Sequence, residues 1–281
     1  MTAMSSVETP SGKGAGDENF PVGSWLLPAR LRPHVAVFYA YARAIDDIAD
    51  NPSLVPEEKV ARLEGFARAI SGAETADPAY EKAHRMRKSL EETNIPAAHC
   101  LDLISAFKQD ATKLRYRDWG ELMDYCNRSA SPVGRYLLDL HSDSKAGYVE
   151  SDALCNALQV LNHLQDCKTD YLQLDRVYLP ETWLKEEGSS VEEFSTVAAS
   201  PGLRRVMDRC LDGVEELLVP ARRLPGVLGN HFLAMESAVI VAIAEQLAHE
   251  LRRRDPLAER VVLSKPAYLS CFLKGIARVL F

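Results

Sequence analysis

The stretch that decides the fold is YAYARAIDDIAD, residues 39–50, in which an apolar helical run ends in three aspartates. Asp46 and Asp50 are four residues apart, so on a helix both carboxylates lie on one face, one turn apart, and Asp47 is turned aside. The three acids share their turn with no base, whereas a solvated helix face normally mixes both charges. The pattern therefore predicts a helix whose end binds a cation.

The same spacing occurs a second time, in LNHLQDCKTDYLQLD, residues 161–175, where Asp166 and Asp170 lie on an amphipathic run. If the two helices face each other, four carboxylates surround one pocket. Mg²⁺ suits such a pocket because it takes a few carboxylates and leaves its other positions to water and substrate phosphates. The predicted ligand is a diphosphate ester. A solvated helix face is the alternative for either motif alone, and a di-iron bundle is disfavoured because only Glu81 and His84 fit its Glu-x-x-His repeat.

Composition limits the remaining possibilities. The chain has 281 residues, 47% of them hydrophobic, which is enough for a sizeable core. A formal charge of −7 without a basic block argues against nucleic acid as a partner. The six cysteines form no C-x-x-C pair, so they predict neither zinc nor a disulfide framework and fit a reducing cytoplasm. No apolar run reaches the roughly 18 residues of a membrane span.

The periodicity predicts a single all-α domain. Apolar positions recur at three- and four-residue spacing from about residue 30 onward, and no strand is required. No repeat of 20 to 50 residues and no Pro/Gly-rich linker divides the chain. Residues 1–18, small and polar, are predicted to be a disordered lead-in to a domain over 19–281. The predicted helices are 30–50, 56–71, 78–93, 98–115, 118–141, 151–173, 202–224, 229–253 and 266–280.

With their flanking residues, the two motifs resemble the aspartate-rich signatures of the squalene and phytoene synthase family. They read Tyr39-x-x-x-Arg43-x-x-Asp46-Asp47-x-x-Asp50 and Gln159-x-x-Asn162-x-x-x-Asp166-x-x-x-Asp170. The resemblance runs from Asn19-Phe20 to the C-terminal helix. It implies an isoprenoid-synthase helical fold around a central cavity, Mg²⁺ held by both motifs, and farnesyl- or geranylgeranyl-type diphosphates as substrates.

The resemblance also implies roles for single residues. Asp46, Asp50, Asp166 and Asp170 take the role of metal ligands. The expected substrate contacts are Arg43 and Asn162 on the diphosphate, Gln159 and Tyr39 along the cavity, Asp110 on an intervening cavity helix, and Arg260 and Lys265 as basic diphosphate contacts near the C-terminus. The structural alternatives are a pairing of Arg43 with Asp47, a surface amide at Asn162, a solvent-facing acid at Asp110, and solvated charges at the two C-terminal bases.

The chain departs from the family pattern at two places. Gln165 and Thr169 replace an Arg and an acid of the second motif, which predicts weaker diphosphate and metal binding there. The family sequence Tyr-x-Val-Ala-Gly-x-Val-Gly becomes NRSASPVG, residues 127–134, so that Asn127 replaces a Tyr and Pro132 interrupts the helix. These changes resemble the hydroxysqualene synthase branch of bacterial hopanoid pathways, in which presqualene diphosphate is ionised and water captures the rearranged cation.

In that interpretation Asn127 holds the attacking water, because an amide both donates and accepts hydrogen bonds. Its structural alternative is a cap for the break before Pro132. Two other functions stay open: a synthase that condenses two prenyl diphosphates to squalene, dehydrosqualene or phytoene, and a catalytically silent relative that acts as an assembly factor.

The C-terminal stretch, residues 265–281, is apolar and carries three bases. One hypothesis is that it lies on the inner face of the membrane and passes the lipid product to other hopanoid-pathway enzymes. The alternative is a helix packed on the domain. The protein is therefore expected in the cytoplasm, with peripheral membrane contact as the hypothesis.

Overall fold

The computed structural model describes residues 6–10, 27–142 and 145–280, and this part of the chain is helical, with one isolated bridge between Arg115 and Val177 and no strand. The all-α prediction is confirmed. Short 3-10 turns lie at Pro78–Tyr80, Lys145–Gly147 and Val191–Ser195. The helices are α1 (Arg32–Ala49), α2 (Pro56–Ile70), α3 (Glu81–Thr93), α4 (Ala98–Asp110), α5 (Trp119–Ser129), α6 (Ser131–Leu140), α7 (Tyr148–Leu174), α8 (Glu181–Glu186), α9 (Pro201–Ala221), α10 (Leu224–Val227), α11 (His231–Arg253) and α12 (Lys265–Leu280).

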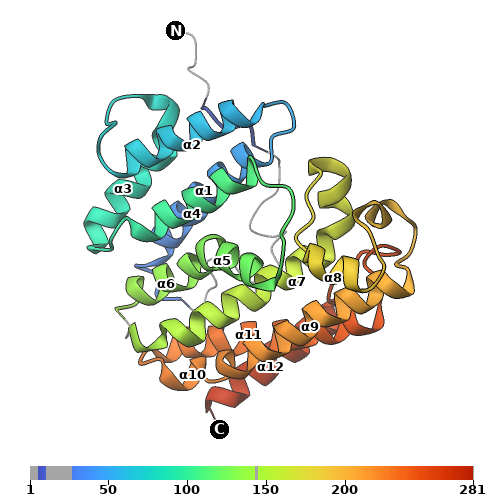
Figure 1. Ribbon diagram of the computed structural model, residues 1–281. Coiled ribbons are helices and arrows are strands. Elements are labelled where there is room, and N and C mark those ends of the chain that lie inside the picture. Colours follow the sequence, from blue (N-terminus) through green and yellow to red (C-terminus); the bar gives the residue numbers. More distant parts are fainter. Residues whose placement is uncertain (1–5, 11–26, 143–144, 281) are drawn as a thin grey trace.

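Helix α7, with 27 residues, runs through the middle of the molecule and packs against α5, α6, α9 and α11 (Figure 1). One hydrophobic cluster surrounds α7, α9 and α11. A second is formed mainly by side chains of α1, α2, α3, α4 and α6. Helices α9, α11 and α12 lie side by side along the lower edge in Figure 1. The two helices that carry the aspartate motifs, α1 and α7, therefore belong to different core clusters.

Helix ends follow local sequence signals. Asp118 accepts a hydrogen bond from the Glu121 N–H, and Ser200 accepts one from the Leu203 N–H, so both side chains satisfy donors that the first helical turn leaves free. Helix α7 ends at Leu174, and the next residue, Asp175, adopts the left-handed conformation with φ of 53°. That turn reverses the chain direction directly after the second aspartate motif.

The predicted helix 118–141 is two helices. Helix α5 ends at Ser129 and α6 begins at Ser131, and Ala130 between them has φ of −121° and ψ of −48°. Pro132 lies in the first turn of α6, where its missing N–H costs no intrahelical hydrogen bond. The predicted interruption at this proline is confirmed, whereas the short helix α8 was not predicted.

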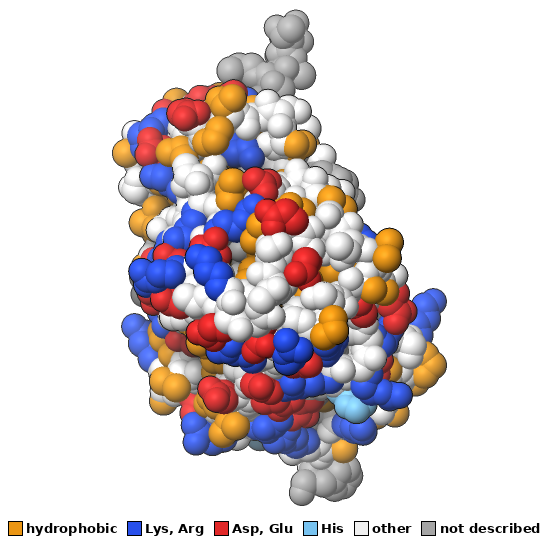
Figure 2. All heavy atoms as spheres, turned by 45° about the vertical axis from the view of Figure 1, so that its right-hand side comes forward, with side chains coloured by type: hydrophobic (Ala, Val, Ile, Leu, Met, Phe, Trp, Pro, Cys, Tyr) orange, Lys and Arg blue, Asp and Glu red, His pale blue; other side chains and the backbone are white. Residues whose placement is uncertain are grey.

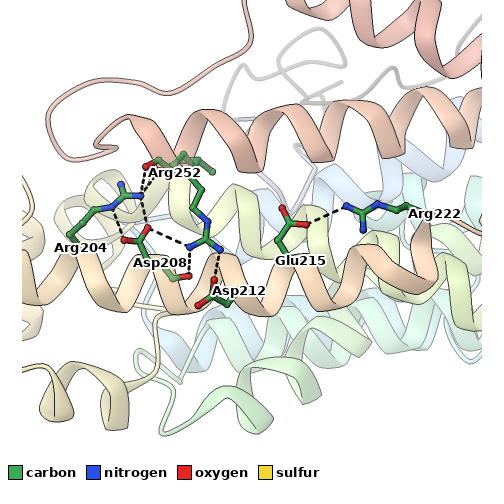
Figure 3. Close-up of polar contacts among 7 residues, drawn as sticks. Arg204, Asp208, Asp212, Glu215, Arg222 and Arg252 are labelled. Carbon is green, nitrogen blue, oxygen red and sulfur yellow. Dashed lines mark hydrogen bonds and ion pairs between the residues drawn. The ribbon is translucent and has the colours of Figure 1, made fainter.

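The far end of α11 is tied to α9 by a network of charged groups (Figure 3). Arg204 of α9 donates to the carbonyls of Leu251, at 2.8 Å, and Arg252, at 3.0 Å, and its guanidinium also pairs with Asp208 at 2.6 Å. Arg252 in turn pairs with Asp212. The network fixes the last turn of α11, and with it the start of the segment 254–264 that leads to α12.

The surface carries charges of both signs. Figure 2 shows acidic and basic side chains interspersed over one face, with hydrophobic side chains in small groups. Residues 6–10, from the predicted lead-in, lie against α3, where Glu8 pairs with Lys82 at 2.9 Å. The other residues of that lead-in, and Asn19-Phe20, lie outside the described residues. Helix α11 is long and apolar enough to cross a membrane, but 61% of its apolar window is buried, as in a core helix.

Candidate active site

The first aspartate motif forms the end of α1. The side chains of Asp46 and Asp50 are 26% and 34% exposed, whereas Asp47 is 3% exposed. Arg43, one turn earlier, pairs with Asp46 at 2.9 Å and with Asp47 at 3.1 Å. The predicted absence of a base beside the acids is therefore wrong for the folded chain, since i,i+3 and i,i+4 contacts bring Arg43 to them. The structural alternative for Arg43, a pairing with Asp47, is present.

The carboxylates of this motif crowd one another. Burial raises the pKa of Asp46 well above its usual value, and the neighbouring Asp50 raises it further, while Arg43 opposes the shift. Neighbouring like charges favour protonation of one of them unless a cation intervenes. The donor set thus fits a hard divalent ion at Asp46 and Asp50. Among the described residues, no three His, Cys, Asp or Glu side chains converge as one preformed metal site.

Arg176, which the sequence patterns did not predict, joins the two motifs. It lies just beyond α7, is 5% exposed, and donates from Nη1 to Asp50 Oδ1 at 2.6 Å. Its backbone N–H donates to the carbonyl of Asp170 at 3.2 Å. One residue therefore contacts the backbone of the second motif and a carboxylate of the first. The only sequence signal is a base directly after the second motif, and its partner is 126 residues away.

The last carbonyl of α1 receives two cationic donors. Arg176 Nη2 and Lys59 Nζ, the latter from the first turns of α2, each donate to the Ala49 oxygen at 2.8 Å. A helix C-terminus carries partial negative charge, so two cations there stabilise the acid-rich end of α1. Helices α1 and α2 and the end of α7 thus meet at one peptide group beside Asp50.

Asp110 belongs to a buried polar and aromatic cluster behind this end of α1. Its carboxylate is 3% exposed and accepts hydrogen bonds from Tyr125 Oη at 2.6 Å and from Tyr178 Oη at 3.3 Å. Burial raises the pKa of Asp110 to about 7, although Arg176 and the tyrosine hydrogen bonds lower it. The alternative of a solvent-facing acid is wrong. His163 stacks on Tyr178 with ring centroids 3.6 Å apart, and burial lowers its pKa to about 3.

The second motif lies on α7, where Asp166 and Asp170 are half-buried. Gln165 is buried, and its Nε2 donates to the carbonyl of Val261 at 2.6 Å. Lys168 donates to the carbonyl of Leu257 at 2.9 Å. These two contacts fasten the segment between α11 and α12 along the motif. Gln165 therefore has a structural role at the position where the family carries an Arg.

Asn127 is exposed on α5, and its Oδ1 accepts a hydrogen bond from Asn156 Nδ2 of α7 at 2.7 Å. Asn156 Oδ1 accepts in turn from Ser131 Oγ at 3.1 Å. Through Asn156, Asn127 is thus linked to Ser131, the first residue of α6 after the break at Ala130. The hydrogen bond between Asn127 on α5 and Asn156 on α7 fixes the orientation of the Asn127 amide nitrogen.

The other predicted site residues lie on α1, on α7 and on the segment that leads into α12. Asn162 is exposed on α7, and Gln159 and Tyr39 are half-buried. Arg260 and Lys265 are exposed, but Arg260 directly precedes Val261, whose carbonyl binds Gln165 beside Asp166. Their roles stay predictions. An external pocket of about 370 Å³ near the first motif has Lys59, Asp110 and Arg176 in its wall.

Comparison with known proteins places this arrangement in a family. The family model for squalene/phytoene synthase matches residues 14–267. A protein of Rhodopseudomonas palustris named hydroxysqualene synthase is 41% identical over 263 residues, 94% of this chain and 88% of its own length. One of the same name from Zymomonas mobilis is 38% identical over 96% of this chain and 91% of its own.

Solved structures agree with the sequence comparison. The crystal structure of squalene synthase HpnC from Alicyclobacillus acidocaldarius superimposes with a TM-score of 0.71 and 32% identity, over 83% of this chain and 87% of that one. A dehydrosqualene synthase with a bound ligand, at 19% identity, has a TM-score of 0.78 over 93% of this chain and 92% of its own, and shows the common fold. The chain belongs to the squalene/phytoene synthase family.

Proposed function

We propose that this protein is a hydroxysqualene synthase. In the reaction, the bond between carbon and diphosphate in presqualene diphosphate breaks, the cyclopropylcarbinyl cation rearranges, and water adds to it with loss of a proton. The products are hydroxysqualene and diphosphate. Relatives named for this activity are 38% to 41% identical over nearly the whole chain. The observation that carries the proposal is the crowded Asp46–Asp50 pair, joined through Arg176 to the second motif.

Mg²⁺ is the cofactor of the proposal. Asp46, Asp50, Asp166 and Asp170 would hold it, and the crowding of Asp46 by Asp50 supports this for the first pair. Bound Mg²⁺ supplies Lewis-acid stabilisation of the charge that develops on the departing diphosphate. The four aspartates supply hard oxygen donors and leave coordination positions open to substrate oxygens.

The chain's own residues orient the reactants. Arg43 and Asn162 would hold the diphosphate, with Arg260 and Lys265 as further basic contacts on the segment fastened to α7. Tyr39, Gln159 and Asp110 would line the cavity. Fixed donors of this kind stabilise the leaving group without having to reorganise during the reaction. An apolar wall keeps stray water from the carbocation.

Asn127 would position the water that ends the reaction. Because its Oδ1 accepts the Asn156 hydrogen bond, its Nδ2 group is held in a defined direction and can donate to a water oxygen. A lone pair on that oxygen then attacks the carbocation. A second candidate function is condensation of two prenyl diphosphates, as in synthases of the squalene, dehydrosqualene or phytoene type. The likeness to the HpnC structure, which is described as a squalene synthase, favours this alternative.

One assay separates the two functions. The protein is incubated with Mg²⁺ and either presqualene diphosphate or farnesyl diphosphate in ¹⁸O-labelled water, without a nicotinamide. We expect hydroxysqualene with ¹⁸O in its hydroxyl group from presqualene diphosphate. Unlabelled hydroxysqualene, or squalene formed only when a nicotinamide is added, would contradict water capture. Conversion of farnesyl diphosphate alone to a C30 product would favour the condensing synthase.

The proposal includes a location. The enzyme would work in the cytoplasm, because its substrate is a charged diphosphate that the site must take from an aqueous or interfacial phase. Its product is an uncharged C30 alcohol with little solubility in water. Peripheral membrane contact and hand-over to other enzymes of the hopanoid pathway are therefore part of the proposal.

A further inference from the structure

Helix α12 has one face that packs on α11 and an opposite face that is exposed. On the packed face, Gly275 lies so close to α11 that a Cβ there would come within 2.5 Å of the Val239 Cα. Cys271, one turn earlier, is also buried and donates to the carbonyl of Ala242 at 3.4 Å. These contacts fix the rotation of α12 about its own axis, so its outward face is defined by the fold.

The outward face is apolar. Leu269, Leu273 and Leu280 are 57%, 59% and 61% exposed. Spacings of four and seven residues place the three side chains on one side of the helix. The antiparallel pairing of α11 and α12 at Val239 and Gly275 brings the start of α11 near the end of α12, where Phe232 is 52% exposed. The leucine stripe, which is Leu269, Leu273 and Leu280, thus continues towards a fourth large apolar side chain.

The charge around the leucine stripe differs from that of the whole chain. The chain has a formal charge of −7, yet α12 contains three bases, Lys265, Lys274 and Arg278, and no acid. All three bases are exposed, and Arg278 also donates to the carbonyl of Arg222 at 3.3 Å. Bases beside exposed leucines on an otherwise acidic protein are complementary to a surface that is both apolar and negatively charged. An anionic lipid bilayer has both properties.

We propose that the outward face of α12 binds an anionic lipid bilayer, with the helix lying in the plane of the interface. The leucine stripe would enter the boundary between head groups and acyl chains, while Lys274, Arg278 and Lys265 bind lipid phosphates. The biological reason for such binding rests on the proposed function, because the lipid product of that reaction has to enter a membrane. A second copy of this chain is a poorer occupant, since two such helices would bring six bases together.

Flotation of the full-length protein with vesicles tests the proposal without any substrate. Vesicles of phosphatidylcholine with phosphatidylglycerol are compared with pure phosphatidylcholine vesicles, each at low and high salt. We expect the protein to float with the anionic vesicles at low salt and to stay at the bottom in the other conditions. A protein that does not float with anionic vesicles at low salt overturns the proposal.

Two double variants separate the apolar and the charged contributions. Leu269→Gln with Leu273→Gln removes two members of the stripe, and its matched control is Val55→Gln with Val197→Gln, at positions 58% and 84% exposed elsewhere. Lys274→Gln with Arg278→Gln removes two bases, and its control is Lys88→Gln with Arg117→Gln. We expect the vesicle partition constant to fall roughly fivefold for each base removed and at least as much for each leucine. The two control variants should float like the unchanged protein. Equal flotation of the leucine variant or the base variant and its control contradicts the proposal.

Two further measurements distinguish insertion into the bilayer from loose adsorption and from self-association. Leu269→Trp should show a blue shift of its added fluorescence on anionic vesicles, and the absence of that shift counts against insertion even when flotation occurs. Sedimentation identifies self-association: a dimer that the Leu269→Gln, Leu273→Gln variant dissociates, with no vesicle binding, would assign the face to a second copy. Because these experiments use no substrate, their failure is distinct from a failure to convert presqualene diphosphate.

Discussion

The guanidinium of Arg176 donates to the carboxylate of Asp50 at 2.6 Å across 126 residues of sequence, and the arginine itself is 5% exposed. Burial opposes its charge, but Tyr178, Asp50 and Asp110 hold its pKa above the ordinary value. A cation kept charged at this depth joins the end of α7 to the end of α1. We expect the relative position of the two aspartate motifs to depend on these contacts of Arg176.

Replacement of Arg176 by Met should therefore reduce both stability and turnover. Loss of one partner of a fully buried ion pair costs roughly 3–5 kcal/mol, and we expect about 2 kcal/mol here because water can reach Asp50. Arg176→Lys should recover part of the stability but little of the activity, since an ammonium lacks the fork that contacts both Asp50 and Ala49. Urea unfolding and turnover measure the two effects.

The control for this change is Arg115→Met, at a neighbouring base that pairs with the exposed Asp175 at 2.6 Å. An exposed pair of this kind contributes at most about 1 kcal/mol. Equal losses in the Arg176 and Arg115 variants would contradict a special role for Arg176.

Both aspartate pairs should be required for turnover. Asp50→Asn and Asp166→Asn each remove one formal ligand charge at nearly constant shape, and we expect a loss of roughly 100-fold or more through weaker stabilisation of the leaving group. The measurement is turnover as a function of Mg²⁺ concentration. Asp175→Asn, an exposed acid directly after α7, is the matched control and should be near unchanged. Full activity of either site variant at limiting Mg²⁺ would rule out the four-carboxylate site.

Asn127→Leu should change which product forms more than how fast substrate is consumed. Without an amide to hold water, the cation is expected to lose a proton instead, so elimination products should increase relative to hydroxysqualene. Product analysis by mass spectrometry gives the ratio. Ser131→Ala is the comparison: it removes the hydrogen bond to Asn156 but keeps the Asn127 amide, so it should change the product ratio less than Asn127→Leu. An unchanged product ratio in Asn127→Leu would assign Asn127 a structural role.

Glu236 on α11 should make stability depend on pH. It is 5% exposed, its Oε2 has no hydrogen-bond partner among the described residues, and burial raises its pKa from 4.5 to about 7. The folded state therefore binds this proton more tightly, so the contribution of Glu236 to stability is fully present below pH 4.5 and is lost as the pH rises through about 7. At pH 8 we expect Glu236→Gln to be more stable than the unchanged protein by about 1 to 3 kcal/mol.

The stability difference between Glu236→Gln and the unchanged protein should shrink towards pH 5, where the Glu236 carboxyl is protonated in the folded state. Unfolding by urea at several pH values measures it. Glu92→Gln, at an exposed acid of α3 paired only loosely with Lys88, provides the control and should show no such trend. A pH-independent difference for Glu236→Gln would mean that folding does not raise the pKa of this carboxyl.

Gly275→Ala should weaken the packing of α12 on α11. The new Cβ would lie 2.5 Å from the Val239 backbone, so the helices must separate, at a cost of about 1–3 kcal/mol. Gly226→Ala is the matched control, because a Cβ there meets no atom within 4 Å and should be neutral or slightly stabilising. Thermal unfolding of the two variants tests the contrast. Equal midpoints would mean that α12 is not closely packed at Gly275.

Local patterns predicted most of the fold because helix periodicity and the two aspartate spacings are properties of short segments. The long helices α7, α9 and α11 lie near their predicted ranges, and the break at Pro132 is present. Such local patterns cannot predict contacts between segments that are far apart in the sequence. Arg176 was missed because nothing near it in sequence shows that Asp50 is its partner. The hydrogen bond from Gln165 to a backbone carbonyl 96 residues away could not be predicted from the motif either, and weaker diphosphate binding at this position stays a prediction.

The double contact at the Ala49 carbonyl has a consequence for engineering and for natural variation in chain length. Lys59 reaches that oxygen from the first turns of α2, and only residues 50–55 separate the two helices. An inserted residue in this connection would rotate or displace Lys59, and the acid-bearing end of α1 would lose one of its two cationic anchors. Beyond Asp50, the connection should therefore accept substitutions more readily than insertions or deletions, so libraries that vary loop lengths should leave it at its present length.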